Sequence, residues 1–463
     1  MNEILFETDW LGSEPVYYNE LTGLASRNIN DVIDLQDMEL DDEGLAAYLD
    51  HGFSVFQRTL VKNVRFLPPS SRLLLGNGGR LVVDRLPDEL GSKLERRCTE
   101  ADIIELVRAR VRDVERSSQG EMVIPTSGGY DSRLLNLMIE DDSRVRTFSY
   151  GTSEPQSCST EVARARALSH LLGTRWERLP IGLFHMYFDD WDRVFGPAVH
   201  AHGMYHMEFY EQVLSRVEGG NVVLSGLFGD WFSGKGDFLL KPVQGPGQVR
   251  QLIEDHGMHA DSSMSYVASS GDLYTEYYET QRDLISSRSR RLIEMVRFRM
   301  MLLHYLKRVP EHFGFQPVAP LIDVDVATAM LSLPAERRID RRWLEEYFTA
   351  CGVGLQDVEG RSLNTLNYQA LRLVPLRPLD EALLREVVRP DYVRWINRNA
   401  GRRGLWWEGY ARLLRRRGIR RAAPRLRSWG LRPRRLDAYC AYLVLKPIER
   451  LLRRRNEARE KAA

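Results

Sequence analysis

The chain has 463 residues, of which 43% are hydrophobic and 28% are charged, and its formal net charge is +1. This composition excludes collagen-like fibres, disulfide-rich miniproteins and wholesale disorder, and the length predicts about two to four globular domains. The four cysteines lie far apart in the sequence, which is typical of reduced thiols. Because the sequence shows no signal peptide and no uncharged apolar run long enough for a membrane span, we expect a cytoplasmic protein.

Residues 1–92 have the pattern of a small α+β domain built from short strands and turns. A helical spacing of apolar residues over Asp42–Phe53 follows Asp41, a residue type suited to cap a helix. Asn77-Gly78 lies between two apolar runs, and this arrangement predicts a β-hairpin. Strands are expected at Val16–Asn19, Ser70–Leu75 and Arg80–Val83.

Residues 93–380 alternate apolar, strand-like runs with longer helical ones, which predicts an α/β domain with a parallel sheet covered by helices. The expected strands are Met122–Pro125, Val145–Tyr150, Trp176–Leu179 and Val222–Leu224. The expected helices are Glu100–Arg116, Asp131–Ile139, Thr160–Leu172 and most of 283–308. Residues 241–271 are rich in Gly, Pro and Ser, so we expect an irregular lid or insertion there.

Residues 381–463 are expected to form a helical, Arg-rich C-terminal region. From residue 411 onward the chain carries 18 Lys or Arg against four acidic residues. Arginine clusters at 415–417, 420–421 and 453–455 flank an apolar run, Tyr439–Leu445, that is too short to span a membrane. Two interpretations stay open: peripheral contact with an anionic membrane, and a solvated pair of Arg-rich helices. The region has no recognisable nucleic-acid-binding module.

The strongest chemical pattern is Met122-Val-Ile-Pro-Thr-Ser127-Gly128-Gly129-Tyr130-Asp131-Ser132-Arg133. A short apolar strand runs into a glycine-rich turn that opens a helix, so successive backbone N–H groups form an anion site. The hydroxyls of Ser127 and Ser132 add donors. Asp131 would repel a phosphate unless a cation lay between them, and the pattern therefore predicts a pyrophosphate group bound with Mg²⁺. A tight turn without a ligand is the alternative.

This string resembles the PP-loop ATP pyrophosphatases, and three further stretches narrow the resemblance to asparagine synthetase-like ligases. They are Phe148-Ser149-Tyr150-Gly151 with its following helix, Val222-Val-Leu-Ser225-Gly226-Leu227-Phe228-Gly229-Asp230, and the stretch from Arg308 to Pro334. The resemblance covers about residues 95–345. It implies an adenine nucleotide alpha-hydrolase-like synthetase fold. Pro15–Asn19 and Thr59–Pro69 resemble the closing strands of the family's glutaminase domain, but its cysteine-bearing front half is missing, so glutamine hydrolysis is not expected.

The resemblance implies that ATP activates a carboxylate as its adenylate, with release of pyrophosphate, before an amine attacks. Asp131 and Asp230 would share Mg²⁺, and Arg308 would contact phosphate or the transition state. The nucleotide-binding residues implied by the family pattern are Ser127, Gly128, Gly129, Tyr130, Asp131, Ser132, Ser149, Tyr150, Gly151, Ser225 and Gly226.

The sequence departs from the family at two catalytic positions. Leu227 stands where amidating members have Glu and lactam-forming members have Tyr, and a leucine side chain cannot accept a proton. The family's C-terminal lysine has no clear counterpart, and Arg361 falls nearest. His200, His202 and His206 form a cluster that would suit a metal or a base. We expect His202 to act as an auxiliary base, the alternative being that all three histidines are core or solvated residues.

Together these patterns favour an ATP-dependent carbon–nitrogen ligase that joins a small-molecule or glycan carboxylate to an amine not released by its own glutaminase. An intramolecular cyclase similar to the lactam synthetases or lasso-peptide cyclases is one alternative. A nucleotide-binding regulatory or scaffold protein with decayed catalysis is another, although the presence of both Asp131 and Asp230 opposes it. Nucleic acid is not an expected partner, and a homodimer is left open.

Overall fold

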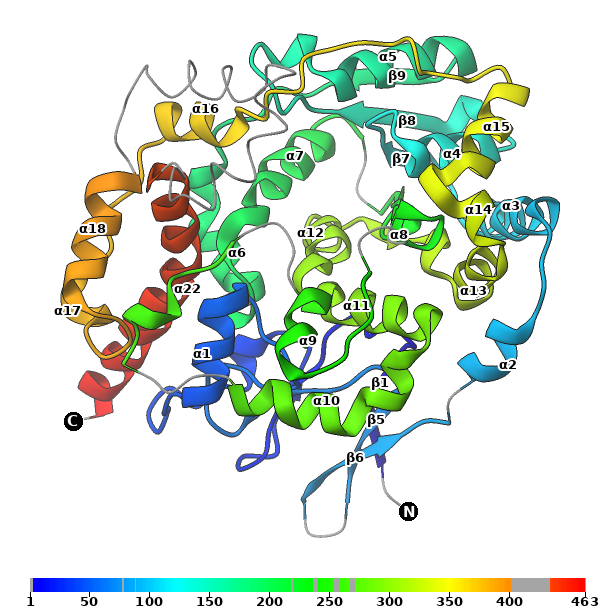
Figure 1. Cartoon of the computed structure of the whole chain (residues 1–463). Helices are drawn as coiled ribbons and strands as arrows, with labels where there is room; N and C mark the ends of the chain where they lie inside the picture. The colour runs from blue at the N-terminus through cyan, green and yellow to red at the C-terminus, as the bar shows by residue number, and fades with distance from the viewer. Residues whose placement is uncertain are drawn as a thin grey trace.

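The computed structural model describes residues 3–462 except 77–78, 88, 218–219, 236–239, 254–257, 267–270 and 401–433. It contains a five-stranded parallel sheet in the order β11-β10-β7-β8-β9. In that order the strands are Gln316–Val318, Val222–Leu224, Met122–Pro125, Val145–Ser149 and Arg175–Arg178. Figure 1 labels β7, β8 and β9 at the upper right. The predicted α/β class with a parallel sheet is confirmed.

The strand order of this sheet reverses between β7 and β10. β8 and β9 lie on one side of β7, whereas β10 and β11 lie on the other. In open parallel sheets a ligand crevice forms outside the carboxyl ends of the strands at such a reversal. Val222 of β10 pairs in parallel with Met122 of β7, so the loops that follow these two strands leave the same edge of the sheet as neighbours.

The helices next to the sheet begin and end where the sequence places capping residues. α3 (Glu100–Ser117) starts with a capping box between Thr99 and Asp102, and its apolar stripe is buried. α4 (Tyr130–Met138) follows β7, and α5 (Thr160–Leu172) ends at Gly173, which has φ of +70°. These elements and the four predicted strands agree with their predicted bounds to within one residue.

The N-terminal part contains two small antiparallel sheets and one helix. β1 (Glu3–Thr8), β5 (Ser71–Leu75) and β6 (Leu81–Arg85) form one sheet, and β2 (Tyr17–Asn19), β3 (Ala25–Ser26) and β4 (Val64–Phe66) form the other. The pairing of β5 with β6 confirms the predicted hairpin, although Asn77-Gly78 lies outside the described residues. β1 was not anticipated from the sequence.

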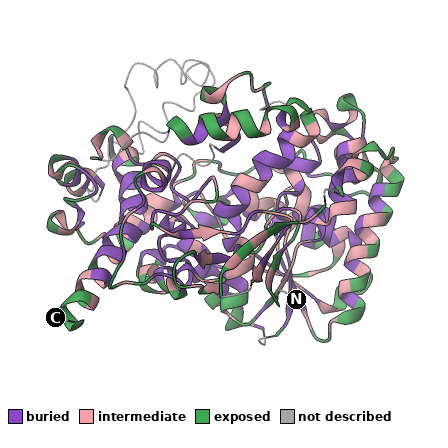
Figure 2. Ribbon diagram, turned by 90° about the horizontal axis from the view of Figure 1, so that it is seen from below, coloured by how far each residue is buried: buried purple, intermediate pink, exposed green. Residues whose placement is uncertain are grey.

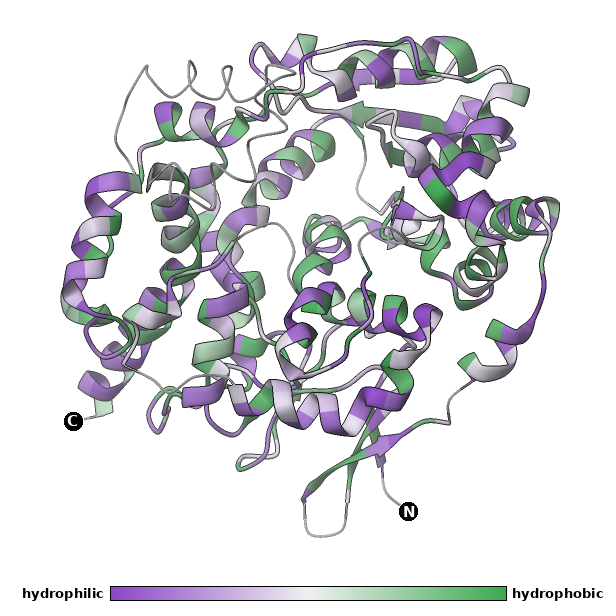
Figure 3. Cartoon of the chain, viewed as in Figure 1, coloured by the Kyte–Doolittle hydropathy of each residue, from purple (hydrophilic) through white to green (hydrophobic). Residues whose placement is uncertain are grey.

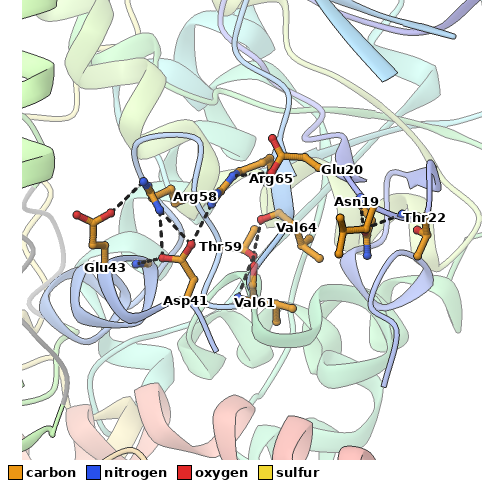
Figure 4. Close-up of polar contacts among 12 residues, drawn as sticks. Asn19, Glu20, Thr22, Asp41, Glu43, Arg58, Thr59, Val61, Val64 and Arg65 are labelled. Carbon is orange, nitrogen blue, oxygen red and sulfur yellow. Dashed lines mark hydrogen bonds and ion pairs between the residues drawn. The ribbon is translucent and has the colours of Figure 1, made fainter. Parts of the chain in front are cut away.

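The buried carboxylate of Asp41 links the N-terminal helix α1 (Asp42–His51) to a neighbouring segment of the same polypeptide. Asp41 caps the helix by accepting a hydrogen bond from Gly44 N at 2.7 Å. Its Oδ2 also lies 3.0 Å from Arg58 Nη1 and 3.1 Å from Arg65 Nη1 (Figure 4). Because Asp41 is only 7% exposed, these two guanidinium groups offset a charge that is largely removed from water.

Residues 241–271 are more regular than the predicted irregular lid. They contain α9 (Pro246–Ile253), whose Val249, Leu252 and Ile253 are buried. α9 packs against α10 (Gly271–Ser286) and α11 (Arg288–Leu303), and α12 (Tyr305–His312) follows α11. The i, i+3, i+4 spacing of the three apolar residues of α9 is the helical pattern that the Gly- and Pro-rich flanks obscured.

The C-terminal helix α22 (Arg434–Ala462) belongs to the body of the molecule and packs beside α18 (Pro390–Ala400). Its apolar run Tyr439–Leu445 is buried, with no residue more than 6% exposed, whereas Leu436 before this run is exposed, as is the C-terminal end of the helix (Figure 2). Arg453, Arg454 and Arg455 form ion pairs with acidic side chains. This buried run therefore offers no apolar surface to a membrane, and the clusters at 415–417 and 420–421 lie outside the described residues.

One apolar core runs through all three predicted segments of the chain. Leu45, Val123 and Leu443 belong to the same buried cluster, and a smaller cluster contains residues of both N-terminal sheets. The peripheral helices carry hydrophobic and hydrophilic residues on the same helix (Figure 3), as expected for elements that cover a core. Among the described helices, none has an apolar stretch long enough to cross a membrane. The predicted boundaries near residues 92 and 380 stay predictions.

Candidate functional site

The glycine-rich loop after β7 packs closely against α5. Gly128 has φ of +65°, and a Cβ there would lie 2.7 Å from the carbonyl carbon of Arg164 and 2.9 Å from Ala165 N, so only glycine fits. The carbonyl oxygen of Gly128 accepts a hydrogen bond from Arg133 Nη2 at 3.1 Å. Ser127 stays exposed. The loop is thus a fixed turn whose N–H groups begin a helix, which is the geometry of an anion site.

The loop after β10 packs directly against the first one. It runs from Ser225 through Phe228, which has φ of +56°, into the short helix α8 (Gly229–Phe232). A Cβ at Gly226 would lie 2.7 Å from Asp131 Cβ, and a Cβ at Gly229 would lie 3.0 Å from Asp131 Cγ. The two glycines of the second loop therefore make room for the aspartate of the first.

This packing brings together the two acids that the sequence placed on separate loops. Asp230 follows Gly229. Burial, and after it the charge of Asp230, raises the pKa of Asp131 to about 8. Arg341 and Lys235 act in the opposite direction. Lys235 Nζ lies 2.5 Å from Asp230 Oδ2. Two neighbouring carboxylates in a partly buried place are an arrangement that a divalent cation stabilises.

The oxygen donors present fit Mg²⁺ better than a softer metal. Asp131 and Asp230 supply carboxylates and Ser225 supplies a hydroxyl at the same pocket. Mg²⁺ is commonly held by one or two carboxylates, with water and phosphate oxygens completing its shell. Within the described residues no group of three or more His, Cys, Asp or Glu could form a closed metal cage. Histidine or thiolate metals are therefore not favoured by these residues.

Arg341 adds a positive charge that the sequence did not reveal. Its guanidinium lies 3.8 Å from the centroid of the Tyr130 ring, at the first residue of α4. Asp340 and Arg341 both have positive φ, of 53° and 55°. Such backbone strain is common where a side chain must be held for function. Arg341 sits in an Arg-rich stretch, 337–342, that gave no sign of which arginine faces the loop.

A pocket of about 390 Å³ opens beside the two acids. Its described lining combines residues from both loops with an aromatic wall from α7 (Tyr205–Leu214) and α12. The lining residues are Pro125, Asp131, Tyr150, Tyr205, His206, Tyr210, Ser225, Gly226, Leu227, Phe228, Asp230, Trp231, Lys235, Leu303, Tyr305 and Leu306. None of the described residues in 241–271 is among them.

The loop after β8 carries the other predicted nucleotide contacts. Tyr150 lines the pocket, whereas the hydroxyl of buried Ser149 accepts a hydrogen bond from Trp176 Nε1 at 2.9 Å. A Cβ at Gly151 would lie 2.7 Å from Gln156 Cα, so this loop folds tightly on itself. The three residues therefore lie at the edge of the sheet beside β7, but only Tyr150 reaches the pocket among them.

Three residues that the sequence singled out are not among the described lining residues of this pocket. Arg308 lines a separate cavity of about 390 Å³ beside Glu14 and pairs with Glu311 at 2.7 Å. The ring of His202 lies near Asn367, and His202 is not among the described residues that line the pocket. Of the three clustered histidines, His206 is the one that lines it. Arg361 lies next to the first residue of α5, where its carbonyl oxygen accepts a hydrogen bond from Thr160 N. Arg308 therefore lies in a different cavity from Asp131 and Asp230, whereas the His202 ring lies 5.5 Å from the ring of Tyr205, a residue of the pocket wall.

The pocket residues that sequence reasoning missed share an aromatic character. Tyr205, Tyr210 and Tyr305 line the wall, and Trp231 follows Asp230 directly. Tyr205 and Tyr210 of α7 are five positions apart, which is not the i, i+3, i+4 spacing of one helix face, so local periodicity gave no signal for this wall. Comparison of the sequence with models of known protein families and with curated proteins finds no match.

Proposed function

We propose that the chain is an ATP-dependent ligase that adenylates a carboxylate and joins it to an amine. The observation that supports this most is the meeting of Asp131 and Asp230, on glycine-containing loops, at the reversal of a parallel sheet. In this proposal the sheet has the adenine nucleotide alpha-hydrolase-like architecture of the PP-loop enzymes, and the asparagine synthetase-like motifs are its functional parts.

The proposed reaction has two steps. A carboxylate oxygen of the substrate attacks the α-phosphorus of ATP, the α–β anhydride bond breaks, and pyrophosphate leaves toward the loop of Ser127 to Ser132. The nitrogen of the amine then attacks the acyl carbon, AMP leaves, and the amine loses a proton. Mg²⁺ held by Asp131 and Asp230 would offset the charge that develops on the leaving pyrophosphate.

The chain's own residues supply the remaining functions of this mechanism. Exposed Ser127 and the N–H groups at the start of α4 bind phosphate oxygens, and Arg341 provides a cation next to them. Buried Leu227 and Phe228 give the pocket an apolar border beside Ser225 and Gly226. Neither of these apolar side chains accepts the amine proton, so the amine either arrives neutral or transfers its proton to another group at the pocket.

An intramolecular cyclase is the second candidate, and the size of the pocket favours it. About 390 Å³ accommodates a ring-sized organic group, which is far more than ammonia requires. The mass of the product distinguishes the two reactions, because a cyclase product is lighter than its substrate by one water, whereas an intermolecular ligase adds the mass of the amine.

The test is calorimetric titration of the full-length chain with ATP in the presence of Mg²⁺. We expect wild-type protein and the exposed-site control Asp113→Asn to bind ATP, and Asp131→Asn to bind at least tenfold more weakly. Pyrophosphate release with pooled carboxylates then identifies the substrate pool. Absence of ATP binding by the wild-type chain, or equal binding by Asp131→Asn, would falsify the proposal.

A further inference from the structure

A cavity of about 440 Å³ lies between the N-terminal part of the chain and the helices α10 and α11. Its described lining residues are Ser54, Phe56, Gln57, Arg58, Phe66, Pro68, Pro69, Arg85, Leu273, Glu276, Tyr277, Thr280, Gln281, Glu294, Arg297, Phe298 and Met301. This lining shares no residue with the described lining of the pocket beside the phosphate loop, so the cavity is a different place from the proposed nucleotide site. Its volume is that of a small-molecule site.

Three aromatic rings from three separate segments meet at this cavity. The centroid of the Phe56 ring lies 5.6 Å from that of Tyr277 in α10 and 5.5 Å from that of Phe298 in α11. The rings of Tyr277 and Phe298 lie 5.1 Å apart. Each ring is therefore held by the other two, and all three residues are only half-buried. Fixed rings that stay partly accessible suit the flat, apolar body of a ligand.

The turn that carries Phe56 is strained. Arg58 N donates a hydrogen bond to Val55 O at 3.0 Å, so Phe56 and Gln57 are the two central residues of a tight turn. Both have positive φ, of 55° and 61°, a conformation for which asparagine and glycine are preferred. Strained positions of this kind cluster at ligand sites, and here the strained turn contributes both of its central residues to the cavity lining.

Two guanidinium groups at the cavity lie near a carboxylate whose oxygens are both engaged. Glu294 Oε1 lies 2.7 Å from Arg297 Nη1, and Glu294 Oε2 accepts a hydrogen bond from Tyr277 Oη at 2.8 Å. Arg297 Nε also donates to the carbonyl oxygen of Trp10 at 2.9 Å. In the part of the chain that the structure describes, no hydrogen bond or ion pair engages the side chain of Arg85. Arg85 is thus the cation at this cavity that can receive an anion.

The electrostatic surroundings of Arg85 favour an anionic ligand. Partial burial, and after it the charge of Arg297, lowers the pKa of Arg85, although a guanidinium stays charged at neutral pH. Arg58 has carboxylate partners of its own (Figure 4). The remaining charged residue of the described lining is Glu276, which is exposed and forms no ion pair with Arg85. A carboxylate placed at Arg85 would offset the repulsion between the two guanidinium groups.

We propose that this cavity is a second ligand site, which binds a small aromatic carboxylate with its ring against Phe56, Tyr277 and Phe298 and its carboxylate on Arg85. The two oxygens of a carboxylate match the parallel N–H groups of a guanidinium. A cavity of about 440 Å³ accommodates an acid with one or two rings. The inference does not depend on the proposed ligase function, because binding here requires neither ATP nor Mg²⁺.

The experiment measures binding of such acids directly. Full-length protein, without nucleotide or Mg²⁺, is titrated by calorimetry with phenylacetate and with indole-3-acetate. The comparison ligands are 2-phenylethanol, which has the ring without the charge, and acetate, which has the charge without the ring. We expect at least one of the two aromatic acids to bind at least tenfold more tightly than both comparison ligands.

Two pairs of variants locate the bound acid. Arg85→Gln should weaken its binding at least tenfold, whereas Arg80→Gln, which changes an exposed arginine of the same hairpin outside the lining, should not. Thr280→Trp places a large side chain into the cavity from α10 and should abolish binding. Thr275→Trp is its matched control, because Thr275 is an exposed residue of α10 that is not among the described lining residues.

Thermal unfolding of each variant shows that it is folded before its affinity is compared, and Thr280→Trp tests the site even if Arg85→Gln does not fold. The absence of binding by both aromatic acids would overturn the inference. Equally tight binding of 2-phenylethanol or acetate would do so as well, and so would an unchanged affinity in folded Arg85→Gln or Thr280→Trp. Loss of ATP binding by the wild-type chain would refute the ligase proposal and leave this site standing.

Discussion

Asp131 is the residue on which the proposed chemistry depends most. Gly226 and Gly229 press against its side chain, and burial together with the charge of Asp230 raises its pKa to about 8. In the free protein near pH 7 this carboxyl therefore carries a proton most of the time. A metal-bound nucleotide requires the ionised form, so binding is coupled to release of that proton.

We predict that the affinity for ATP with Mg²⁺ increases with pH until about pH 8. The free state holds the proton below its pKa of about 8 and the complex does not, so affinity should fall about tenfold per unit below pH 7. Calorimetry in two buffers of different ionisation enthalpy measures the protons released, and we expect about one at pH 7. If Asp131→Asn released the same number of protons on binding ATP, a group other than Asp131 would be the one that loses its proton.

Some residues of the candidate site could be predicted from the sequence, and others could not. Asp131 and Asp230 each follow a short buried strand, which local patterns showed, but their meeting was expected from the family resemblance, because no local pattern shows that β7 and β10 are neighbours. Arg341 and His206 reach the site through contacts between distant segments, which no local spacing encodes. Arg308 was placed by resemblance alone, and its side chain lies in a separate cavity beside the N-terminal segment.

At the scale of elements, the site depends on the close contact between the loop after β7 and the loop after β10. Gly226 does not have a positive φ, so its backbone would accept an alanine, but the added Cβ would lie 2.7 Å from Asp131 Cβ. The cost of such a substitution is therefore a displacement of one loop relative to the other rather than a change within either loop.

We predict that Gly226→Ala weakens ATP binding at least tenfold and destabilises the fold by about 1 to 3 kcal/mol. Displacement of Asp131 separates the two carboxylates that hold the cation. Gly245→Ala is the matched control, because a Cβ at Gly245 meets nothing within 4 Å. Calorimetry and urea unfolding report the two effects, and an unchanged affinity in folded Gly226→Ala would contradict the proposed geometry.

Sequence patterns predicted the central elements well and the peripheral ones poorly. β7 and β10 are continuous apolar runs, and Thr99 and Gly173 mark helix ends by their capping chemistry. The edge strand β11 was missed because Pro317 lies inside it, and proline is confined to strand edges of this kind. The strand order, which creates the crevice, depends on long-range pairing and is not visible in local periodicity.

At the scale of the whole molecule, buried histidines connect the C-terminal helix and the N-terminal helix to the body. His185 Nε2 lies 2.8 Å from Tyr439 Oη of α22, and His51 Nε2 lies 2.6 Å from Tyr274 Oη of α10. Burial lowers the pKa of His185 to about 4 and that of His51 to about 3. His304, next to α12, is lowered to about 4 in the same way.

We predict that the fold loses stability as the pH falls from 6.5 toward 4. Over this range the unfolded chain binds protons that the buried imidazoles do not, so each histidine contributes a loss of about 1.4 kcal/mol per pH unit. Asp131 acts in the opposite direction, because its raised pKa makes the folded state bind a proton below pH 8. His206 adds to the loss as the other three buried histidines do, because burial lowers its pKa to about 3, so the net loss should be smaller than four histidines alone would give. Urea unfolding at pH 7, 6 and 5 measures it, and His185→Gln should reduce the slope by about one proton. A stability that stays constant over this range would mean that these histidines are not held neutral by the fold.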